Sequence, residues 1–255
     1  MCLYYGTWKS SRLMKVNVIV ILLLCVSQIA IAQDKNLDFD KEYFLLGTLR
    51  DYMGREIHNH EIHRVDMYSK NRSGDLPAFI ISMFEDTYPY LILDTTANAK
   101  MDYLYAEGLA KKMNDFYEFK PSGRRTYIGD IDLRAAILDS IYSSPEARQA
   151  FYSQFDTIYQ GRLRSDIFDT DLQKISFIVG AYSRYGWQND STHIIKLYNS
   201  VSKAKTLDKL IKEIGCRNTS YEIIPGIPAT HKIFFTPTEQ LSSHLERVYQ
   251  QVYPQ

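Results

Sequence analysis

The densest group of metal-binding side chains in this sequence is a histidine cluster, His58, His60 and His63, which holds half of the six histidines. Neutral imidazole is a common ligand for zinc and other transition metals. In an extended segment His58 and His60 project to the same side, because side chains alternate with a period of two. His63, Glu56 or Glu61 could add a third ligand. The cluster predicts either a polar surface loop, which we prefer, or a divalent metal site, for which zinc is the natural candidate.

The spacing of these histidines is similar to the H-x-H-x-D-H motif of metallo-β-lactamase-fold hydrolases. That resemblance implies a metal-dependent hydrolase. The sequence departs from the motif at Ile62, which stands at the aspartate position, and no apolar strand ends directly before His58. Metal binding or metal-dependent hydrolysis is therefore kept as the alternative hypothesis. The preferred interpretation requires no cofactor.

A second candidate site is an aromatic group, Tyr182, Tyr185 and Trp187, at the end of an expected helix. Tyrosine and tryptophan combine an apolar face with a polar tip and lose little entropy on binding. In exposed positions they can stack on a ligand or anchor a partner; in buried positions they close the rim of a core. We predict a binding surface here, with an unidentified protein or small ligand as its partner.

No motif in the sequence assigns an enzyme class. The chain lacks the G-x-S-x-G, P-loop, G-x-G-x-x-G and H-E-x-x-H patterns, which mark common hydrolases, nucleotide-binding proteins and zinc proteases. Cys216 is the only cysteine beyond residue 32, so a disulfide within residues 33–255 is impossible. It follows Gly215 at an expected helix end, where the helix dipole disfavours a thiolate. We predict a structural role for Cys216, and whether the protein is an enzyme stays open.

Residues 1–32 have the features of an export signal. Lys9, Arg12 and Lys15 precede an apolar run, and Ala30 and Ala32 provide the small residues that a signal peptidase requires. We expect cleavage after residue 32, a secreted or periplasmic protein, and no membrane insertion after cleavage. The alternatives are an uncleaved anchor, for which the apolar run is short, and a true start at the second methionine, residue 14.

The charge balance is close to neutral. The chain has 30 Lys and Arg, three of them in residues 1–32, against 30 Asp and Glu. The exported form would therefore carry a small negative excess. Binding to nucleic acid is driven by clustered positive charge that displaces counterions from phosphates. We therefore predict no nucleic-acid partner.

Hydrophobic periodicity and capping residues predict an α+β fold. We expect a strand over residues 43–49, a strand over 90–95, a helix of about five turns from residue 97, and a helical middle section. That section comprises helices over residues 131–142, from residue 144 to Gly161, and from Thr170 to Gly186. Residues 192–251 predict a β-α-β-β-α unit with a small mixed or antiparallel sheet covered by helices.

This pattern predicts one α+β domain over residues 33–255, with possible subdivisions at 33–120, 121–188 and 189–255. Together, these observations favour an exported, non-catalytic binding or interaction domain over the metal-dependent alternative.

Overall fold

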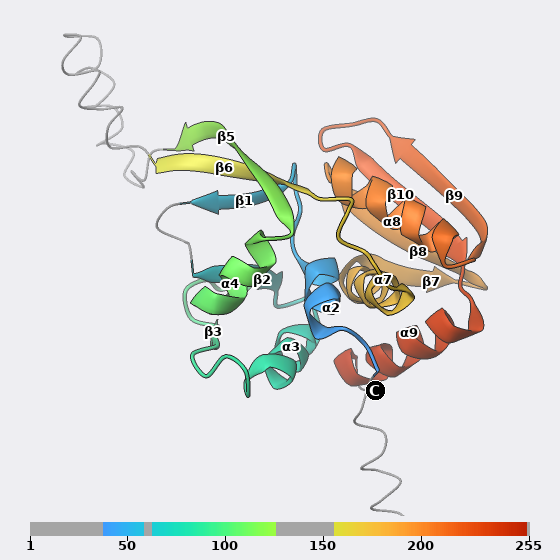
Figure 1. The fold of residues 1–255 in the computed structure, drawn as a ribbon, viewed down its shortest axis with the longest axis horizontal. Coiled ribbons are helices and arrows are strands. Elements are labelled where there is room, and N and C mark those ends of the chain that lie inside the picture. Colours follow the sequence, from blue (N-terminus) through green and yellow to red (C-terminus); the bar gives the residue numbers. More distant parts are fainter. Residues whose placement is uncertain (1–37, 59–62, 126–155, 254–255) are drawn as a thin grey trace, which may run out of the picture. The chain divides into compact units, whose positions relative to one another are not determined.

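Two buried helices, α2 (Lys41–Thr48) and α7 (Asp171–Tyr185), pack along each other and carry much of the core (Figure 1). They belong to a computed structural model that describes residues 38–58, 63–125 and 156–253. The described elements form an α+β fold with antiparallel sheets, which confirms the predicted fold class. Residues 1–32 and the expected helix over 131–142 lie outside the described residues.

Helix α2 forms where the sequence predicted a strand. The Asp40 carboxylate accepts hydrogen bonds from the Glu42 and Tyr43 amides, and so caps the first turn. Phe44 and Leu45 are completely buried, as is the next residue, Leu46. All six residues from Tyr43 to Thr48 are buried, so this part of the helix has no amphipathic period and its short apolar run could not be distinguished from a buried strand.

Two glycines allow α2 and α7 to approach each other closely. A methyl group at Gly47 would overlap the Phe177 carbonyl oxygen, and one at Gly180 would overlap the Phe44 carbonyl oxygen. The backbones are therefore in direct contact at this crossing. Because the overlap is with backbone rather than with a flexible side chain, larger residues cannot be accommodated by a change of rotamer.

Residues 55–163 contribute two small antiparallel sheets, with strand orders β1-β6-β5 and β2-β4-β3. Their strands are β1 (Arg55–His58), β2 (Arg64–Ser69), β3 (Ile92–Asp94), β4 (Met101–Tyr105), β5 (Tyr117–Arg125) and β6 (Asp156–Leu163). Helices α3 (Leu76–Phe84) and α4 (Glu107–Asn114) lie between these strands in the chain.

Two helix predictions fail in this region. The long helix expected from residue 97 is replaced by β4 and the shorter α4. In β4, Tyr103 and Leu104 pair with both neighbouring strands, so sheet pairing outweighs a pattern that also fits a helix. The helix expected to end at Gly161 is also wrong at its end, because residues 156–163 form β6 in the middle of a sheet.

The second half forms a four-stranded antiparallel sheet of order β7-β8-β10-β9. Its elements are β7 (Gly186–Asn189), β8 (Thr192–Tyr198), α8 (Val201–Glu213), β9 (Arg217–Ile224), β10 (Thr230–Thr236) and α9 (Glu239–Val252). The predicted β-α-β-β-α order from β8 to α9 is confirmed, and β7 adds an edge strand. Helices α7 and α8 contact one face of this sheet, which buries Ile195, Leu197, Ile233 and Phe235.

Within the described ranges, no helix is both long and apolar enough to span a membrane.

Candidate functional site

The structure describes only part of the predicted histidine cluster. His58 ends β1, opposite Ile158, whereas His60 lies in the undescribed segment 59–62. His63 is exposed, with its Nδ1 3.7 Å from Glu107 Oε2. Among the described residues no group of three or more His, Cys, Asp or Glu side chains could hold a metal ion. A site made of all three histidines stays a prediction.

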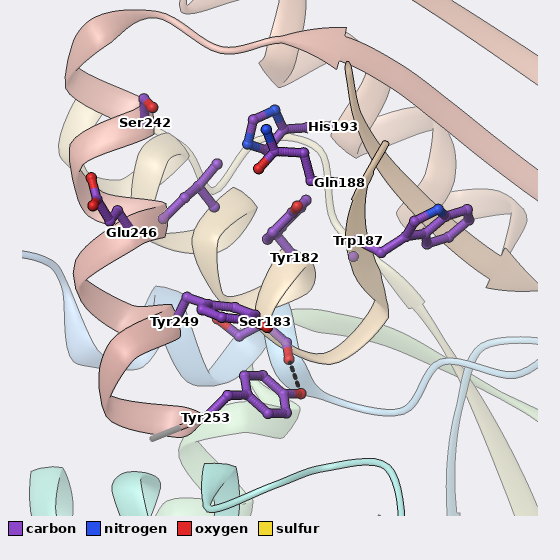
Figure 2. Close-up of a pocket in the computed structure, with 11 residues that line it drawn as sticks. Tyr182, Ser183, Trp187, Gln188, His193, Ser242, Glu246, Tyr249 and Tyr253 are labelled. Carbon is purple, nitrogen blue, oxygen red and sulfur yellow. Dashed lines mark hydrogen bonds between the residues drawn. The ribbon is translucent and has the colours of Figure 1, made fainter. Parts of the chain in front are cut away.

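The predicted aromatic group is divided between two cavities. Tyr182 and Trp187 line a cavity of about 730 Å³ between α9 and the strands β7 and β8 of the four-stranded sheet. Tyr185 lines a different pocket, at the end of β8. The larger cavity, shown in Figure 2, is lined by Tyr182, Ser183, Gly186, Trp187, Gln188, His193, Ser242, Leu245, Glu246, Tyr249 and Tyr253.

The inner wall of the larger cavity belongs to the core. Tyr182 and His193 are each 9% exposed, and their rings lie 5.3 Å apart. Burial raises the pKa of Tyr182 to about 12 and lowers the pKa of His193, so both are neutral at pH 7. The Tyr253 hydroxyl donates to the Ser183 carbonyl oxygen at 3.0 Å and closes one end (Figure 2).

Trp187 turns away from this inner wall. Figure 2 shows its ring on the other side of β7 from Gln188 and His193. This is the alternation expected along a strand, because Trp187 pairs with Ile194 and Gln188 pairs with His193. Trp187, which is 40% exposed, therefore belongs to the sheet face opposite α7 and α8.

That opposite face, which we call the open face, presents a mixture of aromatic and basic side chains. On β10, Lys232 and Phe234 are half-buried while their neighbours on the helix side are buried. Trp187, Ile194 and Phe234 form one row across three strands. We define the open face by Trp187, Ile194, Lys196, Tyr198, Lys232 and Phe234.

Two lysines lie side by side in the middle of the open face. Lys196 on β8 and Lys232 on β10 are directly paired neighbours. Like charges in such a position destabilise a sheet. Glu222 on β9 is paired with Lys232 and partly compensates for it. Lys196 Nζ lies 4.9 Å from the centre of the Tyr198 ring, and neither lysine forms an ion pair with a described residue.

The open face ends at Tyr198, beside a second pocket of about 380 Å³. This pocket, which we call the Asp51 pocket, is lined by Arg50, Asp51, Tyr52, Tyr185, Leu197, Tyr198, Ser200 and Pro228. Tyr198 contributes to both features because β8 ends there and the chain turns into α8. A ligand on the open face therefore has the pocket directly beside it.

Asp51 is the most unusual residue of the pocket. Its side chain is 4% exposed, and neither carboxylate oxygen forms a hydrogen bond with the described residues. Burial raises the pKa of Asp51, and the Lys203 ammonium partly opposes this rise. The Gly54 amide and the Ser200 hydroxyl also lower this pKa, although their geometry falls short of a hydrogen bond. The Ser200 hydroxyl is likewise buried without a partner among the described residues.

Lys203 lies behind the pocket and is completely buried. Its Nζ donates to the carbonyl oxygens of Leu46 and Leu49, at 3.2 and 2.7 Å, and so caps the end of α2. Burial lowers the pKa of Lys203 from 10.5 to about 7, although Asp51 raises it. Carboxylate and amine thus both titrate abnormally, which is typical of functional sites and also of buried ion pairs.

Sequence analysis missed Asp51 and Lys203. The signal for Lys203 was its register in α8, since it lies four residues before the buried Leu207 and so on the apolar side of that helix. A lysine in such a position must be neutralised or paired. For Asp51 the sequence holds no comparable signal, because it follows α2 in an irregular segment.

Comparison with known proteins gives distant structural matches. No family model and no curated protein matches the sequence. Two solved structures of the homing endonuclease I-DmoI are similar to this chain. Mesophilic variants give a TM-score of 0.40 at 9% identity, covering 82% of this chain and 94% of theirs. The complex with DNA and Mn gives a TM-score of 0.39 at 11% identity, covering 83% and 94%.

These matches contradict two predictions from sequence. One is the non-catalytic binding or interaction domain, and the other is the absence of a nucleic-acid partner. The matching structures are of a homing endonuclease, one of them in complex with DNA and Mn, and neither prediction is kept. The charge argument was weak for a physical reason, since a net charge averages over the whole surface and says nothing of a local pair such as Lys196 and Lys232. The likeness is too distant to transfer residue roles, so the function must be argued from this chain's own surface.

Proposed function

We propose that this chain binds single-stranded nucleic acid across the open face. The observation that carries the proposal is the pair of lysines, Lys196 and Lys232, between aromatic side chains on a sheet face opposite the packed helices. A phosphate group between the two ammonium groups replaces their repulsion with two attractive contacts. The lysines thus stabilise the complex while they destabilise the free sheet.

The aromatic side chains supply platforms for bases. Trp187 and Phe234 stand on one side of the lysine row, and Tyr198 stands on the other. Along β8, Tyr198 is two residues from Lys196, or about 6.7 Å. Stacking on such rings contributes roughly 1–3 kcal/mol per base and depends little on base identity.

The same features favour a single strand over a duplex. In a duplex the faces of the bases are hidden in the stack, so Trp187 and Phe234 would have nothing to stack on. Two phosphate contacts give only a modest electrostatic contribution, which suits a chain of neutral overall charge. Binding should therefore rely on stacking and be strongest at low salt.

Fluorescence anisotropy with labelled 20-nucleotide oligo-dT and oligo-U strands tests the proposal. Replacing both lysines, Lys196→Gln with Lys232→Gln, should weaken binding and reduce the slope of log affinity against log salt by roughly 0.7, the contribution of the one phosphate that the two lysines share. The matched control is Lys205→Gln with Lys209→Gln, which removes two exposed lysines of α8 and should leave affinity and slope unchanged.

The aromatic contribution is tested by Phe234→Ala, which should weaken binding roughly 5- to 150-fold, as expected for the loss of one stacked base. Tyr90→Ala is its control, because Tyr90 is 85% exposed and lies far along the chain from the open face. Absence of binding at low salt, or equal losses in the test and control variants, would refute the proposed function.

A further inference from the structure

We infer that the larger cavity binds the pyranose ring of a neutral saccharide, which stacks on the Tyr249 ring and forms hydrogen bonds with the Tyr182 hydroxyl and His193 Nε2. This cavity lies between α9 and the strands β7 and β8 (Figure 2). The inference goes beyond the proposed function, because Gln188 and His193 lie on the side of the sheet opposite Trp187. A saccharide in the cavity neither requires nor excludes a strand on the open face.

The charges around the cavity favour a neutral ligand. Its volume of about 730 Å³ is ordinary for a small-molecule site, and its described lining contains no lysine or arginine. Burial lowers the pKa of His193, so the imidazole is uncharged at pH 7. The one carboxylate of this lining, on Glu246, is exposed and turned away from Tyr182 and His193 (Figure 2). A charged ligand would therefore be buried without a counter-charge, which is costly.

The inner wall of the cavity presents polar atoms that a ligand can reach. The Tyr182 hydroxyl and His193 Nε2 have no hydrogen-bond partner among the described residues, and neither belongs to the fully enclosed polar atoms. His193 Nδ1, by contrast, is enclosed, so a ligand meets the ring at Nε2. The Gln188 amide nitrogen donates to the Asp190 carbonyl oxygen at 2.7 Å, which leaves Gln188 Oε1 to accept.

Hydroxyl groups of a saccharide match this mixture of partners. A hydroxyl group donates one hydrogen bond and accepts others, so it pairs with an amide oxygen, a phenol or either tautomer of a neutral imidazole. A pyranose ring carries several such groups around its edge. It can therefore contact Tyr182, Gln188 and His193 together, whereas a purely apolar ligand would leave all three without partners.

Tyr249 supplies an aromatic platform at the lower end of the cavity. Its ring packs against Tyr253, with the ring centres 5.1 Å apart and the planes tilted by 35°. Tyr253 is itself held by its hydrogen bond to the Ser183 carbonyl oxygen. Tyr249 is nevertheless 56% exposed, so much of its ring remains available to a ligand. The face of an aromatic ring is negative and attracts the weakly positive C–H groups on one side of a pyranose.

The same lining indicates binding rather than cleavage. Glycosidases generally use two carboxyl groups, one on each side of the bond that they break. The described lining provides Glu246 and no second carboxylate. The cavity therefore has the groups that hold a saccharide but not the pair that hydrolyses one.

Saturation-transfer difference NMR of the full chain with glucose, galactose, mannose and N-acetylglucosamine tests the inference. At about 10 mM, at least one of these sugars should receive magnetisation, mainly at the C–H groups of one ring face. The amine and uronic acid analogues of that sugar should bind more weakly, because each would bring an uncompensated charge into the cavity. A trisaccharide that binds about tenfold more tightly identifies the end of a glycan as the ligand, and equal affinity identifies the free sugar.

Two substitutions locate the binding in the cavity. Tyr249→Ala should weaken binding about tenfold, because it removes the platform, and Tyr90→Ala is the matched control, since Tyr90 is 85% exposed and is not part of the lining. Tyr182→Phe should weaken binding roughly 2- to 12-fold, as expected for one hydrogen bond. It should leave the melting temperature unchanged, because the hydroxyl has no partner among the described residues.

Absence of transfer to all four sugars would overturn the inference. Tighter binding of a charged analogue than of its neutral parent would overturn it as well, because the cavity would then recognise charge. Equal losses in Tyr249→Ala and Tyr90→Ala would place the binding elsewhere on the protein. The comparison of ligands requires no variant, so it does not depend on whether a substituted chain folds.

Discussion

The buried amine of Lys203 should make the stability of the protein rise with pH above neutrality. Its pKa in the folded protein is about 7, whereas an unfolded chain restores a value near 10.5. Between these two values the unfolded state binds more protons than the folded state. Raising the pH through this window therefore favours folding, because the amine no longer has to lose its proton on burial.

The magnitude follows from the two pKa values. For a single group with these values, linkage gives a gain of about 2 kcal/mol in the free energy of unfolding between pH 7 and pH 9. Asp51 acts in the opposite direction, because a raised folded pKa makes the folded state bind more protons. The two groups titrate as a pair, so the gain belongs to the pair and is best isolated by comparing variants.

Urea unfolding at pH 7, 8 and 9, followed by circular dichroism, measures this effect. Wild-type protein should gain about 2 kcal/mol over the range, and Lys203→Met should show little or no gain because its side chain has no proton to lose. Lys205→Met, an exposed position on the same helix, should behave as wild type. The explanation fails if the wild-type stability is flat above pH 7, or if Lys203→Met shows the same rise.

Three further predictions follow from the rest of the chain. Gly180→Ala should lower the free energy of unfolding by roughly 1–3 kcal/mol or more, because the new methyl group overlaps the Phe44 carbonyl oxygen; Gly226→Ala, in a roomy loop, is the control, and thermal melting decides between them. Cys216 is half-buried and burial raises its pKa, so a thiol reagent at pH 7 should label the native protein at least about tenfold more slowly than the protein in denaturant; equal rates would contradict this. Residues 1–32 should direct export, and the intact mass of exported protein should then correspond to a chain that starts at Gln33, whereas a mass that retains the apolar run would indicate an anchor.

The parts of the fold that sequence analysis predicted well are those with local signals at both ends. Helix α7 begins at the Thr170 capping box, in which Gln173 bonds back to the Thr170 amide, and it ends before Gly186. Helix α9 has Thr238 as its cap. Such signals lie within four residues of the element that they define, so they can be recognised without knowledge of the rest of the chain.

The open face and the Asp51 pocket could not be predicted in this way. Lys196 and Lys232 become neighbours only through the register of β8 and β10, and one residue of slip would place them on opposite faces. Tyr185 and Trp187 are close in sequence yet line different cavities, because the chain changes from helix to strand between them. Sequence proximity therefore suggested one aromatic site where the structure has two.

The pairing of α2 with α7 has a consequence for how the chain is made. Contacts such as that between the Asp40 amide and the Ser176 hydroxyl join residues 136 positions apart. The central helix pair thus cannot form until most of the chain has been synthesised, and contacts of such long range slow folding. The apolar residues of α2 therefore stay without their partner helix until α7 has been made, late in synthesis.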